Sequence, residues 1–399
     1  MGERVVIRGN EATAWAAKLC RPDVIPAYPI TPSTLFPEKI SEYVANGEIW
    51  NAQFVPVESE HSAMSAAIGA AATGVRVTTA TASQGLELMH EMLFIAAGMR
   101  LPIVMAIGNR ALSAPINIWC DHADTFAARD CGWLQMFAEK SQEAMDLMIM
   151  AFRIAEDKRV LTPAMVGLDA FILTHTFEPV DVPLQEEVDA FLPPYNPEHV
   201  FLDPKRPITI GSFATPATYF EFKYSQEMAI QAAGAVIDEV FKDFEKRFGR
   251  KYQKLMPFMC DDAEIIIMGI GSMMGTCREA VKQMRAEGKK VGLLKMTVYR
   301  PFPEKELIGL VKNAKVLAVL DRDISHGYGG GLFADAGGAM VNEEKVPIME
   351  NFILGMGGRD ILIDDFKNIV AECEKTAKAG KPAKRVNFVN VNFEACKGV

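Results

Sequence analysis

The first half of the chain alternates short apolar runs with longer segments of helical character. Strands are predicted where apolar and β-branched residues gather between turn residues, at residues 24–28, 54–57, 76–81, 103–107 and 164–168. Helices are predicted between them, at residues 33–45, 61–72, 86–98 and 142–157. This alternation is typical of a parallel sheet with helices on both faces, so we expect a doubly wound α/β domain.

From about residue 176 to 257 the pattern loosens, because prolines interrupt any long element before a charged helix near residues 225–248. We interpret this segment as an excursion from the first domain. Long irregular segments are uncommon unless they cover a site or a partner surface. A lid, a docking arm and an elaborated surface loop all remain open readings.

A second, smaller α/β unit is predicted from about Cys260 onward. Its strands are expected at residues 264–268, 290–294 and 316–320, and its helices at residues 275–286 and 304–310. Residues 386–393 then alternate partially, which predicts an edge strand packed on its own domain or on a neighbouring chain. We therefore expect one domain at residues 1–258, with its excursion at about 176–257, and a second at residues 259–399 that includes this tail.

Composition and charge exclude several classes of protein. The 399 residues are 49% hydrophobic and 23% charged, which suits a multidomain globular protein. The net charge of -9 comes from mixed signs without a basic block, so nucleic acid is not an expected partner. The first residues lack an apolar signal core and no apolar run approaches ~18 residues, so we expect a cytoplasmic protein without a membrane segment.

The seven cysteines are scattered, without a C-x-x-C pair or a closely spaced Cys/His set. This spacing argues against zinc, disulfides and an iron-sulfur cluster within the chain. Electron carriers, if the protein uses them, are expected on other chains.

Four successive strand-to-helix turns carry polar residues that suit ligand binding. Thr31 is held between Pro29 and Pro32, and Glu60 opens a helix of small residues of the kind found at domain or subunit junctions. Ser83 lies in the third turn and Arg110 in the fourth. Each alone is explained by helix capping or a surface turn. Their convergence at the carboxyl ends of parallel strands, where such sheets bind ligands, favours a site.

Three familiar cofactor and nucleophile motifs are absent or incomplete. Residues 269–275 have a third glycine one place late for G-x-G-x-x-G, and no acidic residue ends the next strand, so nicotinamide binding is rejected. No G-x-S-x-G elbow or P-loop occurs. The glycine run 327–331 cradles an anion or serves as a structural turn.

Several strings of the chain, in order, closely resemble the α subunit of the pyruvate:ferredoxin oxidoreductase family. They are Tyr28-Pro-Ile-Thr-Pro-Ser33, Glu58-Ser-Glu60, Thr81-Ala-Ser-Gln-Gly-Leu86, Asn109 to Trp119, Lys295 to Phe302, and Val319 to Arg322 with the glycine run. The resemblance implies a pyrimidine-binding thiamine diphosphate domain over residues 1–258. It implies that a transketolase C-terminal-like domain follows.

The resemblance also assigns roles. Glu60 matches the glutamate that binds the aminopyrimidine ring of the cofactor, with Glu58 as support, and Ser83 and Gln84 fall in a cofactor-binding string. Thr31 and Arg110 match the residues that position the 2-oxo acid. Thr31, Glu60 and Arg110 are therefore the expected catalytic residues, and no metal ligand is expected in this chain.

The implied reaction is the oxidative decarboxylation of pyruvate to acyl-coenzyme A and CO2, with electrons passed to ferredoxin, as in the EC 1.2.7 enzymes. The chain contains no Gly-Asp-Gly segment to hold magnesium and diphosphate. The resemblance therefore implies a diphosphate-binding β-type subunit, an iron-sulfur subunit and a γ-type subunit, with Mg²⁺ and [4Fe-4S] clusters on these partners.

Two alternatives remain. A relative acting on 2-oxoglutarate, a branched-chain oxo acid or oxalate would share these strings, although Thr31 in place of a second cation suits a monoacid such as pyruvate. A noncatalytic scaffold subunit would keep the fold but is expected to lose the four polar turn residues together. All four are present, which favours an enzyme subunit.

Overall fold

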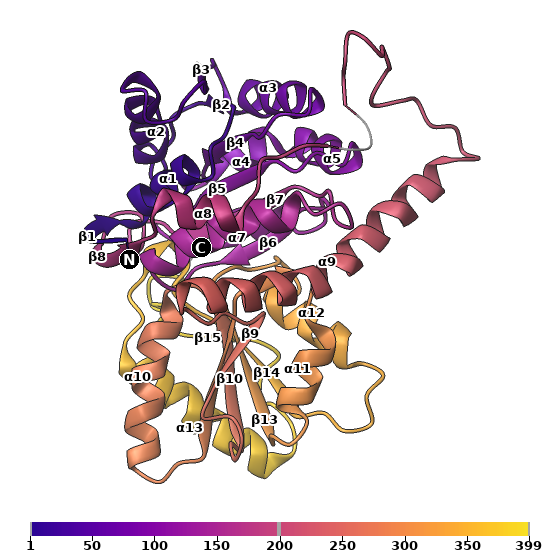
Figure 1. Cartoon of the computed structure of the whole chain (residues 1–399). Helices are drawn as coiled ribbons and strands as arrows, with labels where there is room; N and C mark the ends of the chain where they lie inside the picture. Colours follow the sequence, from indigo (N-terminus) through magenta and orange to yellow (C-terminus); the bar gives the residue numbers. More distant parts are fainter. Residues whose placement is uncertain (1, 198–200, 398–399) are drawn as a thin grey trace.

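The computed structural model describes residues 2–197 and 201–397. Two sheet-containing units lie one above the other, and the long helix α9 (Tyr219–Phe248) runs between them (Figure 1). The first unit contains β1 (Glu3–Arg8), α1 (Gly9–Leu19), β2 (Val24–Ala27), α2 (Leu35–Ala45), β3 (Gln53–Pro56), α3 (Glu60–Ala72), β4 (Thr78–Thr81), α4 (Gln84–Leu88), α5 (His90–Gly98), β5 (Val104–Asn109), α6 (Ala123–Ala127), β6 (Leu134–Phe137), α7 (Ser141–Ala155), β7 (Ala164–Asp169), β8 (Phe177–Val182) and α8 (Gln185–Phe191).

The first sheet has the strand order β12-β6-β7-β5-β4, in which β12 (Val298–Arg300) comes from the later part of the chain. β2 and β3 form a parallel pair that a Val24–Val77 bridge joins to the edge next to β4. Alternate residues of β5 enter two separate apolar clusters. Val104 and Ala106 pack with α1 and α7, whereas Met105 and Ile107 pack with α3 and α5. A strand with two apolar faces needs helices on both sides, so the predicted doubly wound fold is confirmed.

The second unit is smaller. It contains β9 (Leu255–Phe258), β10 (Ile265–Ile270), α10 (Met273–Ala286), β11 (Val291–Met296), β12 (Val298–Arg300), α11 (Glu304–Val311), β13 (Val316–Asp321), α12 (Gly331–Met340), β14 (Ile348–Ile353), a 3-10 turn (Met356–Gly358), α13 (Ile363–Ala379) and β15 (Asn387–Phe388). Its sheet order is β15-β14-β13-β10-β11-β9. The tail strand β15 pairs in parallel with β14 of the same chain.

Two strands tie the units together across the expected boundary at residue 258. β9 precedes that boundary but pairs antiparallel with β11 of the second sheet. β12 follows it but pairs antiparallel with β6 of the first sheet. The exact division of the chain into domains stays a prediction, because the two sheets exchange strands.

The excursion is more ordered than the sequence suggests. It contains β8, α8 and the whole of α9, which begins at Tyr219 and not near Ser225. The amino-terminal half of α9 and the loop before it project from the body (Figure 1), with Phe213 94% exposed and Phe220 78% exposed. The base of this arm contacts the carboxyl ends of α3 and α5, where the Leu202 backbone N–H donates to Ala72. The arm therefore does not cover the four polar turns, which lie at the other end of those helices.

Candidate active site

The four polar turns share one edge of the first sheet. β2 and β3 are parallel, β4 and β5 are parallel, and the Val24–Val77 bridge between the two pairs is also parallel. Thr31, Glu60, Ser83 and Arg110 each follow the carboxyl end of one of these strands. The fold therefore brings all four predicted residues to the same rim, although their side chains differ in what they contact.

Arg110 is buried beside Thr31. Its Nη1 group donates to the backbone carbonyl of Thr31 at 2.9 Å, and its Nε group donates to the carbonyl of Asn117 at 3.0 Å. Burial lowers the pKa of the guanidinium, and the charge of Asp124 opposes that shift. Among the described residues, Nη2 has no hydrogen-bond acceptor and the exposed Thr31 hydroxyl has no partner. Both groups thus remain available to a carboxylate.

The two glutamates at the start of α3 have different environments. Ser59 caps the helix by accepting from the Ser62 backbone N–H at 3.2 Å. The exposed Glu58 carboxylate accepts from the Ser62 hydroxyl at 2.6 Å, and this hydrogen bond lowers its pKa. Glu60 is only 6% exposed, and no group in residues 2–197 or 201–397 hydrogen-bonds its carboxylate. Ser59 therefore caps α3 without help from Glu60. Helix capping does not explain why the Glu60 side chain is enclosed.

Gly85 lies against the Glu60 carboxylate. A Cβ at position 85 would stand 2.7 Å from Glu60 Oε1 and 2.4 Å from Thr81 Oγ1, so no larger residue fits there without displacing them. Thr81 Oγ1 and Gln84 Nε2 are also buried without a partner in the described structure. Unpaired buried polar groups cost ~1–3 kcal/mol each. Thr81 Oγ1 and the Glu60 carboxylate, both next to Gly85, are therefore available to a polar ligand.

Ser83 does not present its hydroxyl at the rim. Its side chain is fully buried, and Oγ donates to the carbonyl of Ala111 at 2.5 Å. Its backbone has a φ of +50°, a left-handed conformation that is uncommon outside glycine. The hydroxyl fastens this turn to the one that carries Arg110. A direct contact of Ser83 with cofactor stays a prediction, and the neighbouring Gln84 has an amide nitrogen that is buried without a partner in the described structure.

Asp124 connects the same two turns and was missed from the sequence. Its Oδ2 accepts the backbone N–H groups of Ser83 and Arg110, each at 3.0 Å. Its Oδ1 accepts from the Asn109 amide at 3.0 Å. Burial raises the pKa of Asp124 to about 6, against the donors that favour its charged form. In the sequence Asp124 stands in the polar stretch Asp121-His-Ala-Asp-Thr125, and nothing there identifies these partners.

A second buried network joins the two units beside the site. Asp169, at the end of β7, accepts from His122 at 2.8 Å and from Arg322 of the second unit at 2.9 Å. Burial disfavours the charged form of Asp169, but His122 and Arg322 outweigh it and hold its pKa below the ordinary value. Ser272 of the second unit also donates to Asp169 through its backbone and hydroxyl groups.

Cys120, His122 and Asp169 lie close enough together to resemble a metal site, which the sequence spacing did not suggest. Arg322 already supplies a positive charge there, because its Nη1 donates to both Cys120 Sγ, at 3.0 Å, and Asp169. The guanidinium of Arg322 thus compensates the negative charge of Asp169 in this cluster. Cys120 serves as an acceptor in this junction between the units.

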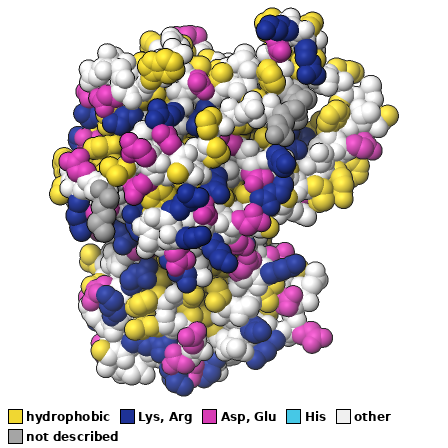
Figure 2. Space-filling model, viewed as in Figure 1, with side chains coloured by type: hydrophobic (Ala, Val, Ile, Leu, Met, Phe, Trp, Pro, Cys, Tyr) yellow, Lys and Arg dark blue, Asp and Glu magenta, His cyan; other side chains and the backbone are white. Residues whose placement is uncertain are grey.

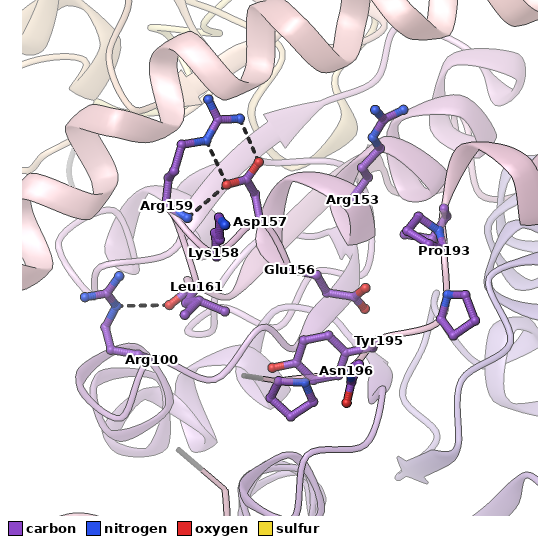
Figure 3. A pocket seen from close by; sticks show the side chains of 13 residues that line it. Arg100, Arg153, Glu156, Asp157, Lys158, Arg159, Leu161, Pro193, Tyr195 and Asn196 are labelled. Carbon is purple, nitrogen blue, oxygen red and sulfur yellow. Dashed lines mark hydrogen bonds and ion pairs between the residues drawn. The ribbon is translucent and has the colours of Figure 1, made fainter. Parts of the chain in front are cut away.

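One cavity lies away from the four turns. It has a volume of about 1010 Å³ and is lined by Arg100, just beyond α5, by residues 156–159 and 161, which follow α7, and by residues 192–197 (Figure 3). Arg159 is paired with Asp157 and Glu239, and Arg100 donates to the Leu161 carbonyl. A second cavity of about 690 Å³ lies between residues 111–130 and residues 323–326 of the second unit, next to the Arg110 turn.

Comparisons with known proteins agree on one family. The family described as "Pyruvate flavodoxin/ferredoxin oxidoreductase, thiamine diP-bdg" matches residues 15–242, and its core domain II matches residues 263–366. Pyruvate synthase subunit PorA of Pyrococcus furiosus is 58% identical over 394 residues, covering 99% of each chain. The ketoisovalerate oxidoreductase subunit VorA of Pyrococcus abyssi is 48% identical over 387 residues, covering 97% of each.

Two solved structures share the fold. A 2-oxoglutarate:ferredoxin oxidoreductase from Magnetococcus marinus superposes with a TM-score of 0.73 at 18% identity, over 93% of this chain and 65% of that one. A split-gene transketolase superposes with a TM-score of 0.53 at 12% identity, over 94% of this chain and 99% of that one.

Charges of both signs are interspersed over the face shown in Figure 2. Among the described residues no helix is both long and apolar enough to cross a bilayer. The chain belongs to the pyruvate:ferredoxin/flavodoxin oxidoreductase family.

Proposed function

We propose that this chain is the α subunit of a pyruvate:ferredoxin oxidoreductase and forms the pyrimidine-side wall of a thiamine diphosphate site that a partner chain completes. The observation that carries the proposal is Glu60, a residue only 6% exposed whose carboxylate has no hydrogen-bond partner within the described residues and lies against Gly85. A carboxylate in so enclosed a position that lacks a partner within its own chain suits a ligand that donates a hydrogen bond. We assign that donor to a ring nitrogen of the cofactor.

Glu60 is assigned to hold that ring nitrogen, and the unpaired groups of Thr81 and Gln84 to bind the polar substituents beside it. Thiamine diphosphate, once bound, supplies the carbanion chemistry and the electron sink that decarboxylation of a 2-oxo acid requires. The chain's contribution is thus to bind and orient the ring, and to keep one carboxylate ready to exchange a proton with it.

Arg110 and Thr31 are assigned to the substrate. The free Nη2 of Arg110 and the exposed Thr31 hydroxyl offer one cation and one neutral donor. That pair matches a single carboxylate next to a keto oxygen, as in pyruvate. Pyruvate synthase subunits are 58% identical in Pyrococcus furiosus but 47% in Methanothermobacter thermautotrophicus, against 48% for a ketoisovalerate oxidoreductase subunit, so the assignment to pyruvate rests on Arg110 and Thr31 rather than on identity.

The remaining groups are assigned to partner chains. A β-type subunit would hold Mg²⁺ and the diphosphate, an iron-sulfur subunit would carry [4Fe-4S] clusters to ferredoxin, and a γ-type subunit would complete the assembly. Coenzyme A would take the acyl group. The absence of a Gly-Asp-Gly segment and of clustered cysteines from the sequence supports this division.

The test is reconstitution. We expect the full-length chain alone to bind thiamine diphosphate weakly in calorimetry and to reduce no ferredoxin with pyruvate and coenzyme A. We expect addition of its partner chains to restore both. A panel of 2-oxo acids on that complex should favour pyruvate over 2-oxoisovalerate and 2-oxoglutarate. Full activity of the isolated chain would refute the shared site, and preference for a branched-chain acid would reassign the substrate.

A further inference from the structure

We propose that Asp124 is a positioning residue that fixes Arg110 for substrate binding by fastening the Ser83 turn to the Arg110 turn. The inference rests on the proposed function, because it takes the guanidinium of Arg110 as the group that meets the 2-oxo acid. It concerns a residue that lies outside the four turns themselves, on the short helix α6.

The contacts of Asp124 are made to backbone groups of two different turns. Its Oδ2 accepts from the backbone N–H of Ser83, 41 positions earlier, and from that of Arg110, 14 positions earlier. Its other oxygen accepts from Asn109 Nδ2 at 3.0 Å and from the Thr125 N–H at 2.7 Å. The side chain is fully buried, so water does not replace these donors.

The Ser83 turn needs such a contact. Its φ of +50° is disfavoured by about 1 kcal/mol or more for a residue with a side chain. The hydrogen bond from its N–H to a carboxylate is charge-assisted and compensates for that strain. The Ser83 hydroxyl then bonds the Ala111 carbonyl, so the two turns are joined both directly and through Asp124.

Arg110 is held at both ends as a result. Its backbone N–H is fixed by Asp124, and its guanidinium is fixed by the carbonyls of Thr31 and Asn117. The remaining nitrogen, Nη2, therefore points in one direction only. Without the carboxylate, two buried N–H groups lose their acceptor, and the turn relaxes to recover hydrogen bonds elsewhere. A shift of the guanidinium by about 1 Å is enough to weaken a directional grip on a carboxylate.

The test uses the assembled complex with Asp124→Ala and Asp124→Asn. The matched control is Asp146→Asn, because Asp146 is an equally buried aspartate on α7 that accepts from Arg250 and Tyr252. We expect Asp124→Ala to raise the KM for pyruvate by roughly 10- to 100-fold with a smaller change in kcat. Asp146→Asn should change that KM by less than about 2-fold while lowering the melting temperature comparably.

Asp124→Asn provides the conservative rescue. Its amide oxygen can still accept the backbone N–H groups of Ser83 and Arg110, and Asn109 can rotate to present Oδ1, which is buried without a partner in the described chain, to the new amide. Only the Thr125 N–H then loses its acceptor. We expect the KM for pyruvate of Asp124→Asn to lie much closer to the wild-type value than that of Asp124→Ala. Hydrogen exchange supplies a readout besides activity. In Asp124→Ala, peptides covering residues 83–87 and 108–112 should exchange roughly tenfold faster, whereas in Asp124→Asn and Asp146→Asn they should exchange at close to the wild-type rate.

A double-mutant cycle decides whether Asp124 acts through Arg110. The KM effect of Asp124→Ala should disappear in an Arg110→Ala background. An equal effect in both backgrounds would overturn the inference, as would an Asp124→Ala complex with the KM and exchange of the wild type. If Arg110→Ala raises KM but Asp124→Ala does not, the inference fails and the proposed function stands. If Arg110→Ala leaves KM unchanged, the substrate role proposed for Arg110 fails as well.

Discussion

Arg110 Nη1 donates a 2.9 Å hydrogen bond to the backbone carbonyl of Thr31, across 79 positions of the chain. The contact joins the first and the fourth polar turn and places a guanidinium beside a threonine hydroxyl. It uses the backbone of Thr31 and leaves the hydroxyl free. Substrate binding on this rim therefore depends on the shape of Arg110 as well as on its charge.

The first prediction follows from that shape. Arg110→Lys keeps the positive charge, but the ammonium has its donors on one atom. It lacks the planar spread of nitrogens with which Arg110 meets the Thr31 and Asn117 carbonyls and still presents Nη2 to a substrate carboxylate. We expect the KM for pyruvate to rise by roughly 10-fold or more, with a smaller effect on kcat. Steady-state assays of the complex measure both, with Arg153→Lys as a control because Arg153 pairs with Asp243 at the other cavity. An unchanged KM for pyruvate would show that substrate binding does not depend on the shape of the guanidinium.

The second prediction concerns the space at Gly85. In Gly85→Ala the new methyl would collide with Glu60 Oε1 and Thr81 Oγ1, at 2.7 and 2.4 Å, so Glu60 must move. We expect the Kd for thiamine diphosphate in the complex to rise by roughly 10-fold or more. Gly309→Ala in α11 is the control: nothing lies within 4 Å of its Cβ, and replacing a helical glycine should raise stability by about 0.5–1 kcal/mol. Calorimetric titration that gives the wild-type Kd for Gly85→Ala would contradict the assignment.

The third prediction is a pH dependence in the second unit. Burial raises the pKa of Asp321 to about 7, and burial together with the charge of Asp321 raises the pKa of Asp323. The folded chain therefore holds a proton that the unfolded chain releases above about pH 4. Stability from this pair is present at low pH and is lost as the pH rises through 7. Melting temperatures from pH 5 to 8 should fall less steeply in Asp323→Asn, and an unchanged slope would argue against a shared proton.

The fourth prediction concerns the junction between the units. Asp169→Asn leaves Arg322 buried without its carboxylate, so we expect a loss of about 3–5 kcal/mol in the free energy of unfolding. Arg21→Met, which breaks the exposed pair with Asp189, should cost less than about 1 kcal/mol. Denaturant titration of the full chain compares the two variants. Equal losses would mean that the Asp169–Arg322 pair does not hold the units together.

Much of the fold could be predicted because its pattern is local. A strand with two apolar faces, such as β5, predicts helices on both sides of the sheet. The helix α1 was missed because Ala12, Ala14, Ala16 and Ala17 are buried all around it, so no single apolar stripe shows in the sequence. The predicted helix at residues 86–98 is divided at Met89 into α4 and α5, a break without glycine or proline to signal it.

The site could be predicted in part. The four turns were found because residues at the carboxyl ends of parallel strands meet at one edge. Capping chemistry alone could not separate Glu58 from Glu60, since both suit a helix start, and the family resemblance selected Glu60. The fold adds that Ser62 bonds Glu58. The inward direction of the Ser83 hydroxyl depends on Ala111, 28 positions away. Such long-range partners leave no periodic signal.

The central claim is that Glu60, and not its neighbour, binds the pyrimidine ring. Turnover of pyruvate by the assembled complex, compared between Glu60→Gln and Glu58→Gln, tests it most directly. The two variants remove one charge each from positions two residues apart, of which one is buried and one is exposed. We predict that Glu60→Gln lowers kcat by more than about 100-fold, whereas Glu58→Gln stays within about 3-fold of the wild type. A Glu60→Gln complex that turns over normally, or an equal loss in Glu58→Gln, would contradict the account.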